Sequence, residues 1–218
     1  MQDITKFLKD NSDEKKAKFD KSLITSQYEI LGIKTSVLED KSKQLAKQNE
    51  LFDLNPQFHE EILLYGIVLS KLKISSNEKV DLIKNVLPYI DNWATCDMIA
   101  CRLKNIEDQS DFFYSLLESD KPYFVRFCIV WLMRFYFKID LKKAVFAIKN
   151  VKFDHFYVKM AKAWAYATAC AIDFDFTLDI INSEEEFVRK KSIQKGIESF
   201  RLTPAQKDVL KALRKISN

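Results

Sequence analysis

The sequence predicts an all-α protein built as a stack of short helices, and three observations favour this fold class. Only 3 Gly and 4 Pro occur in 218 residues, where an average chain of this length holds roughly 25 of them. Apolar residues recur with the period of an amphipathic helix along nearly the whole chain. Hydrophobic residues make up 47% of the chain and include 17 Phe, which is ample for a sizeable core. Hairpin-rich architectures and intrinsic disorder are therefore excluded.

The apolar period and the capping signals predict about twelve helices and no strand. Nine of these helices are expected near residues 14–31, 36–48, 57–73, 77–90, 92–104, 109–118, 141–149, 155–172 and 175–182. Three more begin at start signals. Pro122 suits a first helical turn, because proline there loses no hydrogen bond that the helix would have made. The tetrapeptides that begin at Ser183 and Thr203 both fit the capping box.

Three of the helical segments share a small residue that follows a cation by two positions. The pairs are Arg126 with Cys128, Lys159 with Ala161, and Lys190 with Ser192. The small residues are 33 and 31 positions apart, which is the length of a two-helix repeat. Chance similarity among amphipathic helices is the open alternative. If the register holds, the three cations project from equivalent places and form a row that can follow a phosphate backbone.

Charge is unevenly distributed along the chain, although the net charge is only +4. Residues 51–120 carry 6 basic against 12 acidic side chains, whereas residues 121–171 carry 10 against 2. A basic surface of this kind attracts a polyanion, and nucleic acid is the commonest polyanion that a cytoplasmic protein meets. Ordinary solvated helix faces would have the same composition, so charge alone leaves both interpretations open.

Several classes of function are excluded by motifs that the sequence lacks. It has no nucleophile elbow, phosphate-binding glycine loop or dinucleotide fingerprint. His59 and His155 are too far apart for a zinc motif. The four cysteines are expected to act as small apolar residues and are Cys96, Cys101, Cys128 and Cys170. We expect no metal and no other cofactor.

Targeting and membrane signals are also missing from the sequence. Its apolar runs are far shorter than the roughly 20 residues of a membrane helix. Neither end resembles a secretory signal or a lipidation tag. We therefore expect a cytoplasmic protein that has no membrane partner.

The segment Asp91-Asn92-Trp93-Ala-Thr-Cys-Asp97 carries the most distinctive chemistry. Asp91 and Asn92 suit a helix cap, and Trp93 and Asp97 lie one turn apart on the same face. An indole beside a carboxylate forms a small site that can hold a cationic or electron-poor group. A buried indole and a solvated carboxylate would show the same pattern, so the residues alone leave both interpretations open.

Together with later segments, residues 91–97 resemble the AlkD-type DNA alkylation repair glycosylases. About thirty residues further on comes Val-Arg-x-Cys-Ile, which begins at Val125, and later comes the Ala163-Trp164 pair. The resemblance also includes residues 28–35 and 60–66 and ends in the tail 188–201. It implies a HEAT-like helical repeat solenoid, an α-α superhelix similar to ARM repeats, that forms a single domain over residues 1–218. This superhelix has a concave DNA-binding face.

The resemblance implies a DNA glycosylase that excises positively charged N3- or N7-alkylated purines from duplex DNA without a deep base-flipping pocket. Its catalytic residues would be Trp93, Asp97, Arg126 and Trp164. Further cations would contact the DNA, and these are Arg134, Lys159, Arg189, Lys190, Lys191, Lys195 and Arg201. The partner would be double-stranded DNA containing alkylated bases, and we expect the protein to be a monomer.

The sequence departs from the family pattern one turn after Trp164, where Ala167 replaces a basic residue. Two alternatives to the glycosylase stay open. One is a catalytically silent DNA-binding member of the same superfamily, and the other is a helical-repeat scaffold that binds proteins. Only a DNA binder would lose affinity steeply as the salt concentration rises.

Overall fold

The computed structural model describes residues 4–49 and 51–216, and these residues form two compact helical units. The first unit ends at Phe112 and the second begins at Phe113. Within the described ranges there are thirteen α-helices and no β-strand, only an isolated parallel bridge between Glu29 and Phe58. The predicted all-α class is therefore confirmed. The single domain over residues 1–218 and the concave DNA-binding face stay predictions.

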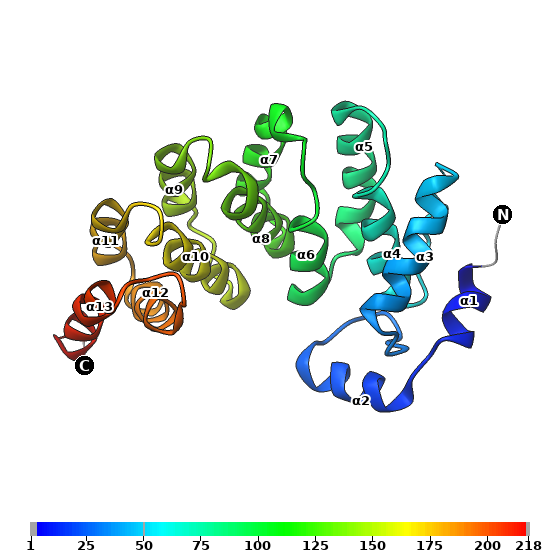
Figure 1. Ribbon diagram of the computed structural model, residues 1–218, viewed down its shortest axis with the longest axis horizontal. Coiled ribbons are helices and arrows are strands. Elements are labelled where there is room, and N and C mark those ends of the chain that lie inside the picture. The colour runs from blue at the N-terminus through cyan, green and yellow to red at the C-terminus, as the bar shows by residue number, and fades with distance from the viewer. Residues whose placement is uncertain (1–3, 50, 217–218) are drawn as a thin grey trace. The chain divides into compact units, whose positions relative to one another are not determined.

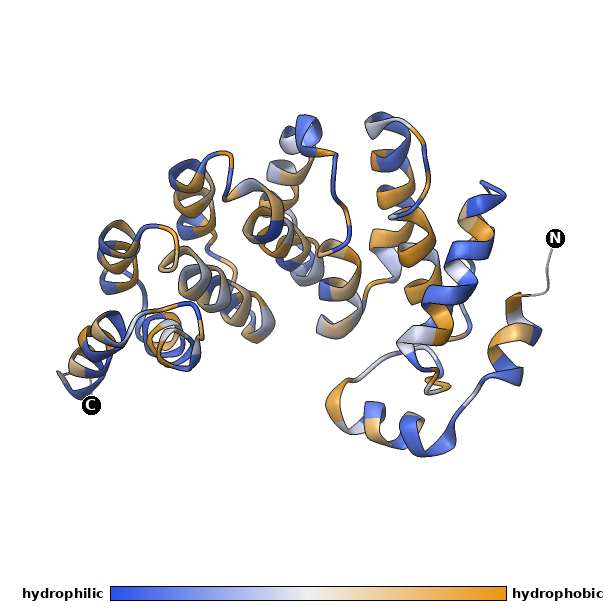
Figure 2. Ribbon diagram, in the orientation of Figure 1, coloured by the Kyte–Doolittle hydropathy of each residue, from blue (hydrophilic) through white to orange (hydrophobic). Residues whose placement is uncertain are grey.

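The first unit is built from six helices and the beginning of a seventh. These are α1 (Ile4–Asp10), α2 (Glu14–Leu23), α3 (Thr35–Lys47), α4 (His59–Leu69), α5 (Ser76–Val86), α6 (Trp93–Ala100) and α7 (Ser110–Ser115). Helix α4 is buried over nearly its whole length, and much of it is coloured as apolar in Figure 2. It packs against α3, α5 and α6 and so forms the centre of this unit.

The second unit has two layers of helices (Figure 1). One layer consists of α8 (Pro122–Trp131), α10 (Phe156–Ala169) and α12 (Glu186–Glu198), and α8 continues as a π-helical turn to Tyr136. The other layer contains α9 (Leu141–Asn150) and α11 (Phe174–Asn182). Helix α13 (Pro204–Ile216) then packs on α12. No helix in the described part of the chain is long and apolar enough to cross a lipid bilayer.

The predicted two-helix register is present in the second unit. Cys128, Ala161 and Ser192 lie on α8, α10 and α12, and all three are buried. Helix α10 packs on both α8 and α12, so each small side chain lies within the same layer of helices. Short side chains at these positions allow the helix backbones to approach closely, as repeat stacking requires.

Two sequence-based predictions are wrong in detail. The helix expected over residues 14–31 ends at Leu23, because Ile24 is extended and the following backbone binds distant carboxylates. Ser183 does not cap a helix start. Its hydroxyl donates to the carbonyl of Ile180 at the end of α11, and α12 begins only at Glu186. The capping box at Thr203 is confirmed by its two reciprocal hydrogen bonds with Gln206.

Gly66 is the position where α4 and α6 approach most tightly. A Cβ atom at Gly66 would lie 2.4 Å from Cγ1 and 3.0 Å from Cγ2 of Ile99, a fully buried residue of α6. At Gly196 of α12 a Cβ would meet only Cδ1 of Leu210 at such short range, 2.6 Å away. The end of a leucine can rotate away, whereas both branches of the isoleucine have to move.

We therefore expect Gly66→Ala to lower the free energy of unfolding by about 1–3 kcal/mol, because it overpacks the contact between α4 and α6. Gly196→Ala is the matched control, since both changes replace a glycine within a helix and gain the same helix propensity. Its cost should be smaller. Urea denaturation measures both variants, and equal midpoints for the two would contradict the packing argument.

Candidate functional site

The start of α6 is fixed by the side chain of Asn92. This side chain accepts a hydrogen bond from the backbone N–H of Thr95 at 3.0 Å, and Asn92 itself is 2% exposed. Asn92 is therefore the N-cap of α6, as the sequence predicted. Since the cap decides where the helix begins, it makes Trp93 the first helical residue and places Asp97 one turn later.

Asp91 ties this helix start to a distant part of the first unit. Its Oδ2 atom accepts hydrogen bonds from the Ser26 hydroxyl at 2.8 Å and from the backbone N–H of Gln27 at 2.7 Å. Its Oδ1 atom accepts one from the Asn92 side chain at 2.8 Å. The carboxylate thus joins the segment after α2 to the cap of α6, a role that the sequence did not reveal.

His59 supports the same cap from α4. Its Nδ1 atom lies 3.3 Å from the Thr95 hydroxyl and 3.5 Å from the Asn92 side-chain nitrogen. Burial lowers the pKa of His59, so the imidazole is neutral at pH 7 and serves as a fixed polar support. The sequence suggested only that His59 belongs to no zinc motif.

Glu60 holds the loop that leads from α2 to α3. Its buried carboxylate accepts hydrogen bonds from three successive backbone N–H groups, those of Leu31, Gly32 and Ile33, at 3.1, 2.7 and 3.2 Å. Gly32 has φ +75°, and a Cβ there would lie 2.2 Å from the backbone nitrogen of Ala17 in α2. This loop therefore sets the position of α2 against the rest of the unit.

Trp93 packs on α2 and on the loop after it. It is partly buried against Ala17, Ile24 and Ile30. Its Nε1–H donates to the carbonyl oxygen of Leu23 at 3.4 Å. Asp97 follows on the same helix and is partly exposed. The structure thus keeps the indole and the carboxylate on one short helix, with the indole held from α2.

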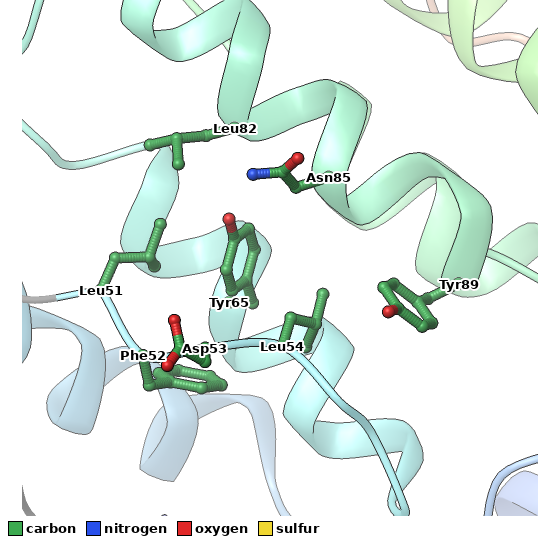
Figure 3. A pocket seen from close by; sticks show the side chains of 8 residues that line it. All are labelled: Leu51, Phe52, Asp53, Leu54, Tyr65, Leu82, Asn85 and Tyr89. Atoms are coloured by element: carbon green, nitrogen blue, oxygen red, sulfur yellow. The ribbon is translucent and has the colours of Figure 1, made fainter.

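A separate hollow of about 420 Å³ lies between α4, α5 and the loop before α4. Figure 3 shows its lining, which consists of Leu51, Phe52, Asp53, Leu54, Tyr65, Leu82, Asn85 and Tyr89. Neither Trp93 nor Asp97 is among these residues. The hollow is therefore distinct from the pair on α6.

In the second unit, Arg126 is buried between neighbouring helices. It is 5% exposed, and its Nη1 donates to the carbonyl oxygen of Tyr157 in the first turn of α10 at 2.6 Å. The guanidinium therefore joins α8 to α10. Trp164 lies two turns after Tyr157, which puts both on the same side of α10, and both are partly exposed.

The three cations of the predicted row occupy different surroundings. Arg126 is buried, whereas Lys159 forms ion pairs with Asp154 at 2.6 Å and with Glu185 at 3.1 Å. The hydrogen bond to Asp154 raises the pKa of Lys159. Lys190 is paired with Glu186 of its own helix at 2.6 Å. The charge of Lys159 is thus balanced by two carboxylates in this structure.

The other predicted DNA-contacting cations lie on the surface of the second unit. Arg134 is exposed on the π-helical turn after α8. Arg201 is exposed in the loop after α12. Those on α12 are partly exposed, and they are Arg189, Lys190, Lys191 and Lys195. All of these side chains are at least partly exposed, although the Nε atom of Arg189 is buried.

Comparison with known proteins identifies the class to which this helical repeat protein belongs. A family model described as DNA alkylation repair enzyme matches residues 4–200. The chain therefore belongs to the DNA alkylation repair enzyme family, and the resemblance seen in the sequence is confirmed. The family implies a DNA substrate. No curated protein and no solved structure matches the chain.

Removing the cap of α6 should destabilise the first unit. We expect Asn92→Ala to lower the free energy of unfolding by about 1 kcal/mol, because the N–H of Thr95 loses its acceptor. Asn92→Ser keeps a capping oxygen and should retain most of the stability. Thermal unfolding of the three proteins measures the difference. If alanine and serine have the same effect, the cap does not fix the helix start.

Removing the two ion-pair partners of Lys159 should strengthen DNA binding. The double variant Asp154→Asn with Glu185→Gln removes both ion-pair partners, and we expect severalfold tighter binding to duplex DNA at low salt. The matched control is Asp40→Asn with Asp81→Asn, which frees Lys43 and Lys84 outside the predicted DNA-contacting set. Fluorescence anisotropy compares the two variants at equal net charge. An equal gain in both would show that Lys159 has no particular contact with DNA.

Proposed function

We propose that this protein is a DNA glycosylase that excises N3- or N7-alkylated purines from duplex DNA. The observation that carries the proposal is the pair Trp93 and Asp97, one turn apart at the capped start of α6, in a chain that belongs to a DNA alkylation repair family. A rigid helix start is a suitable support for catalytic groups, because their positions are set before the substrate binds.

The substrate itself makes the reaction easier. Alkylation at N3 or N7 leaves the purine with a positive charge, so the base is a good leaving group and needs little acid catalysis. The bond between C1′ of the deoxyribose and the base nitrogen breaks, and its electron pair leaves with the base. Positive charge then develops on the sugar until water adds at C1′. The products are a free alkylated base and an abasic site.

Asp97 is our candidate for stabilising the developing charge on the sugar. A carboxylate near C1′ lowers the energy of the cationic transition state, orients the attacking water and accepts its proton. Trp93 would contribute the electron-rich face of its indole to the same cationic centre. The capping bonds of Asn92 and Asp91 support both roles by fixing the helix from which the two side chains project.

Arg126 and Trp164, both in the second unit, are the other two residues of the catalytic set that the family resemblance implies. Arg126 is buried and donates to the carbonyl oxygen of Tyr157, so we assign to it the positioning of α10, the helix that carries Trp164. Trp164 would press against the sugar and the backbone. Its partial exposure leaves ring surface available for such a contact. The exposed cations of α12 would add phosphate contacts that are individually weak.

We expect Asp97→Asn to reduce release of 3-methyladenine or 7-methylguanine by a factor of about 10² or more, because the variant lacks the negative charge that stabilises the transition state. Chromatography of bases released from methylated duplex DNA measures the rate. Asp81→Asn, at an exposed position of α5, is the control for loss of one carboxylate. Circular dichroism establishes that both variants are folded.

Three outcomes would contradict the proposal in different ways. Unchanged release by the Asp97 variant would remove the role of this carboxylate. Salt-dependent DNA binding without any base release by the wild type would indicate the catalytically silent alternative. Absence of salt-dependent binding would instead favour the protein-binding scaffold.

A further inference from the structure

Phe200 is the most exposed large apolar side chain that the structure describes. Its relative exposure is 102%, and it lies in the loop between α12 and α13. The loop around it is anchored, because Leu202 is buried and the N–H of Arg201 donates to the Ser199 hydroxyl at 3.2 Å. Full exposure of a phenylalanine forgoes about 1.5–3 kcal/mol that burial would contribute. The anchored loop therefore presents a ring whose whole face is available to a binding partner.

Helix α13, which begins four residues after Phe200, carries a line of cations. Lys207, Lys211, Arg214 and Lys215 are spaced by four, three and one residues, so they follow one side of the helix. Leu210 is fully buried and packs at Gly196 of α12, which fixes the orientation of α13 on the second unit. Residues 201–216 contain five basic side chains and one acidic side chain, Asp208. The segment that follows Phe200 in the chain is thus strongly basic.

We propose that the Phe200 ring and the cationic side of α13 form a binding site for single-stranded DNA. The ring would stack on an unpaired base, and the cations of α13 would contact the phosphates that follow this base along the strand. Proteins that bind single strands without reading sequence combine these two elements, an aromatic platform and a basic track. The family model ends at residue 200, so α13 lies beyond the segment that defines the family.

The geometry favours a single strand over an intact duplex. Bases in a duplex are already stacked on their neighbours, so a protruding phenylalanine finds no free base face there. The cations extend over nine residues of helix, and the eight steps between the first and the last span about 12 Å, which is enough to reach a few successive phosphates of one strand. This proposal rests on the proposed function only in taking DNA as the substrate. It adds a second DNA contact to the one at which the base is released.

The test compares binding of single-stranded and duplex DNA by the full chain. Two fluorescein-labelled probes are used. One is an oligodeoxythymidine of about 16 nucleotides, which covers the usual site sizes, and the other is a blunt duplex of the same length. We expect Phe200→Ala to weaken single-strand binding about fivefold or more and to leave duplex binding nearly unchanged. The control is Phe19→Ala, which removes another exposed phenylalanine (61%) from the first unit.

A second variant tests the cations. Lys211→Gln with Arg214→Gln should lower the slope of log K against log salt by roughly 1.4 on the single strand, which corresponds to two phosphate contacts. Lys43→Gln with Lys47→Gln on α3 is the matched control. Lys43 and Lys211 both pair with an aspartate three residues earlier, at 2.9 and 2.8 Å, so the local change is alike.

The outcomes separate this proposal from the proposed function. Intact base release with no effect of either variant on single-strand binding would overturn this proposal alone. Loss of single-strand binding in the variants, together with no base release by the wild type, would support it and overturn the glycosylase. Binding of α13 to phosphatidylserine vesicles but not to the oligonucleotide would assign the surface to lipid and overturn the proposal.

Discussion

The cap of α6 is the constraint on which the candidate active site depends. Asn92 fixes the first turn, and Asp91 joins that turn to the loop after α2. Without these bonds a helix of eight residues would fray at its start, since short helices are marginally stable by themselves. Trp93, the first residue of the helix, would be among the residues that fray first. Side chains without any proposed contact to DNA therefore decide how the proposed catalytic pair, Trp93 and Asp97, is positioned.

Loop position and helix position are coupled in the first unit through two carboxylates. Glu60 binds three N–H groups of the loop before α3, and Asp91 binds the segment just before it. Charge-assisted hydrogen bonds of this kind are stronger than neutral ones. They hold α2 in place, and α2 in turn supplies the surface on which Trp93 packs. A few polar contacts between residues far apart in the sequence thus fix the position of the Trp93 indole.

The second unit uses much of its positive charge inside its own fold. Arg126 bonds to the backbone of α10, and Lys162 lies in a buried ion pair with Glu184 at 3.0 Å. Lys159 is balanced by two carboxylates. The excess of basic residues in the sequence therefore overstates the charge available to DNA. The predicted row of Arg126, Lys159 and Lys190 therefore accounts for little of the accessible positive charge. More of this charge lies on the other basic residues of α12 and α13.

The helices were predictable where their signals are local. The capping box at Thr203 and the spacing of Trp93 and Asp97 depend on residues within four positions of each other, and both predictions agree with the structure. The end of α2 was not predictable, because it depends on Asp91, 64 residues away from Gln27. The capping box predicted at Ser183 is absent because this hydroxyl donates to the carbonyl of Ile180 at the end of the preceding helix. The support of the α6 cap by His59 could not be predicted either, because only the fold brings α4 next to Asn92 and Thr95.

The proposed reaction breaks the bond between an alkylated purine and its sugar. The most direct measurement is mass spectrometry of both products after wild-type protein acts on a duplex that contains one 7-methylguanine. The account predicts free 7-methylguanine in solution and an abasic site in the DNA strand. A strand that keeps its base, either methylated or restored to guanine, would contradict it.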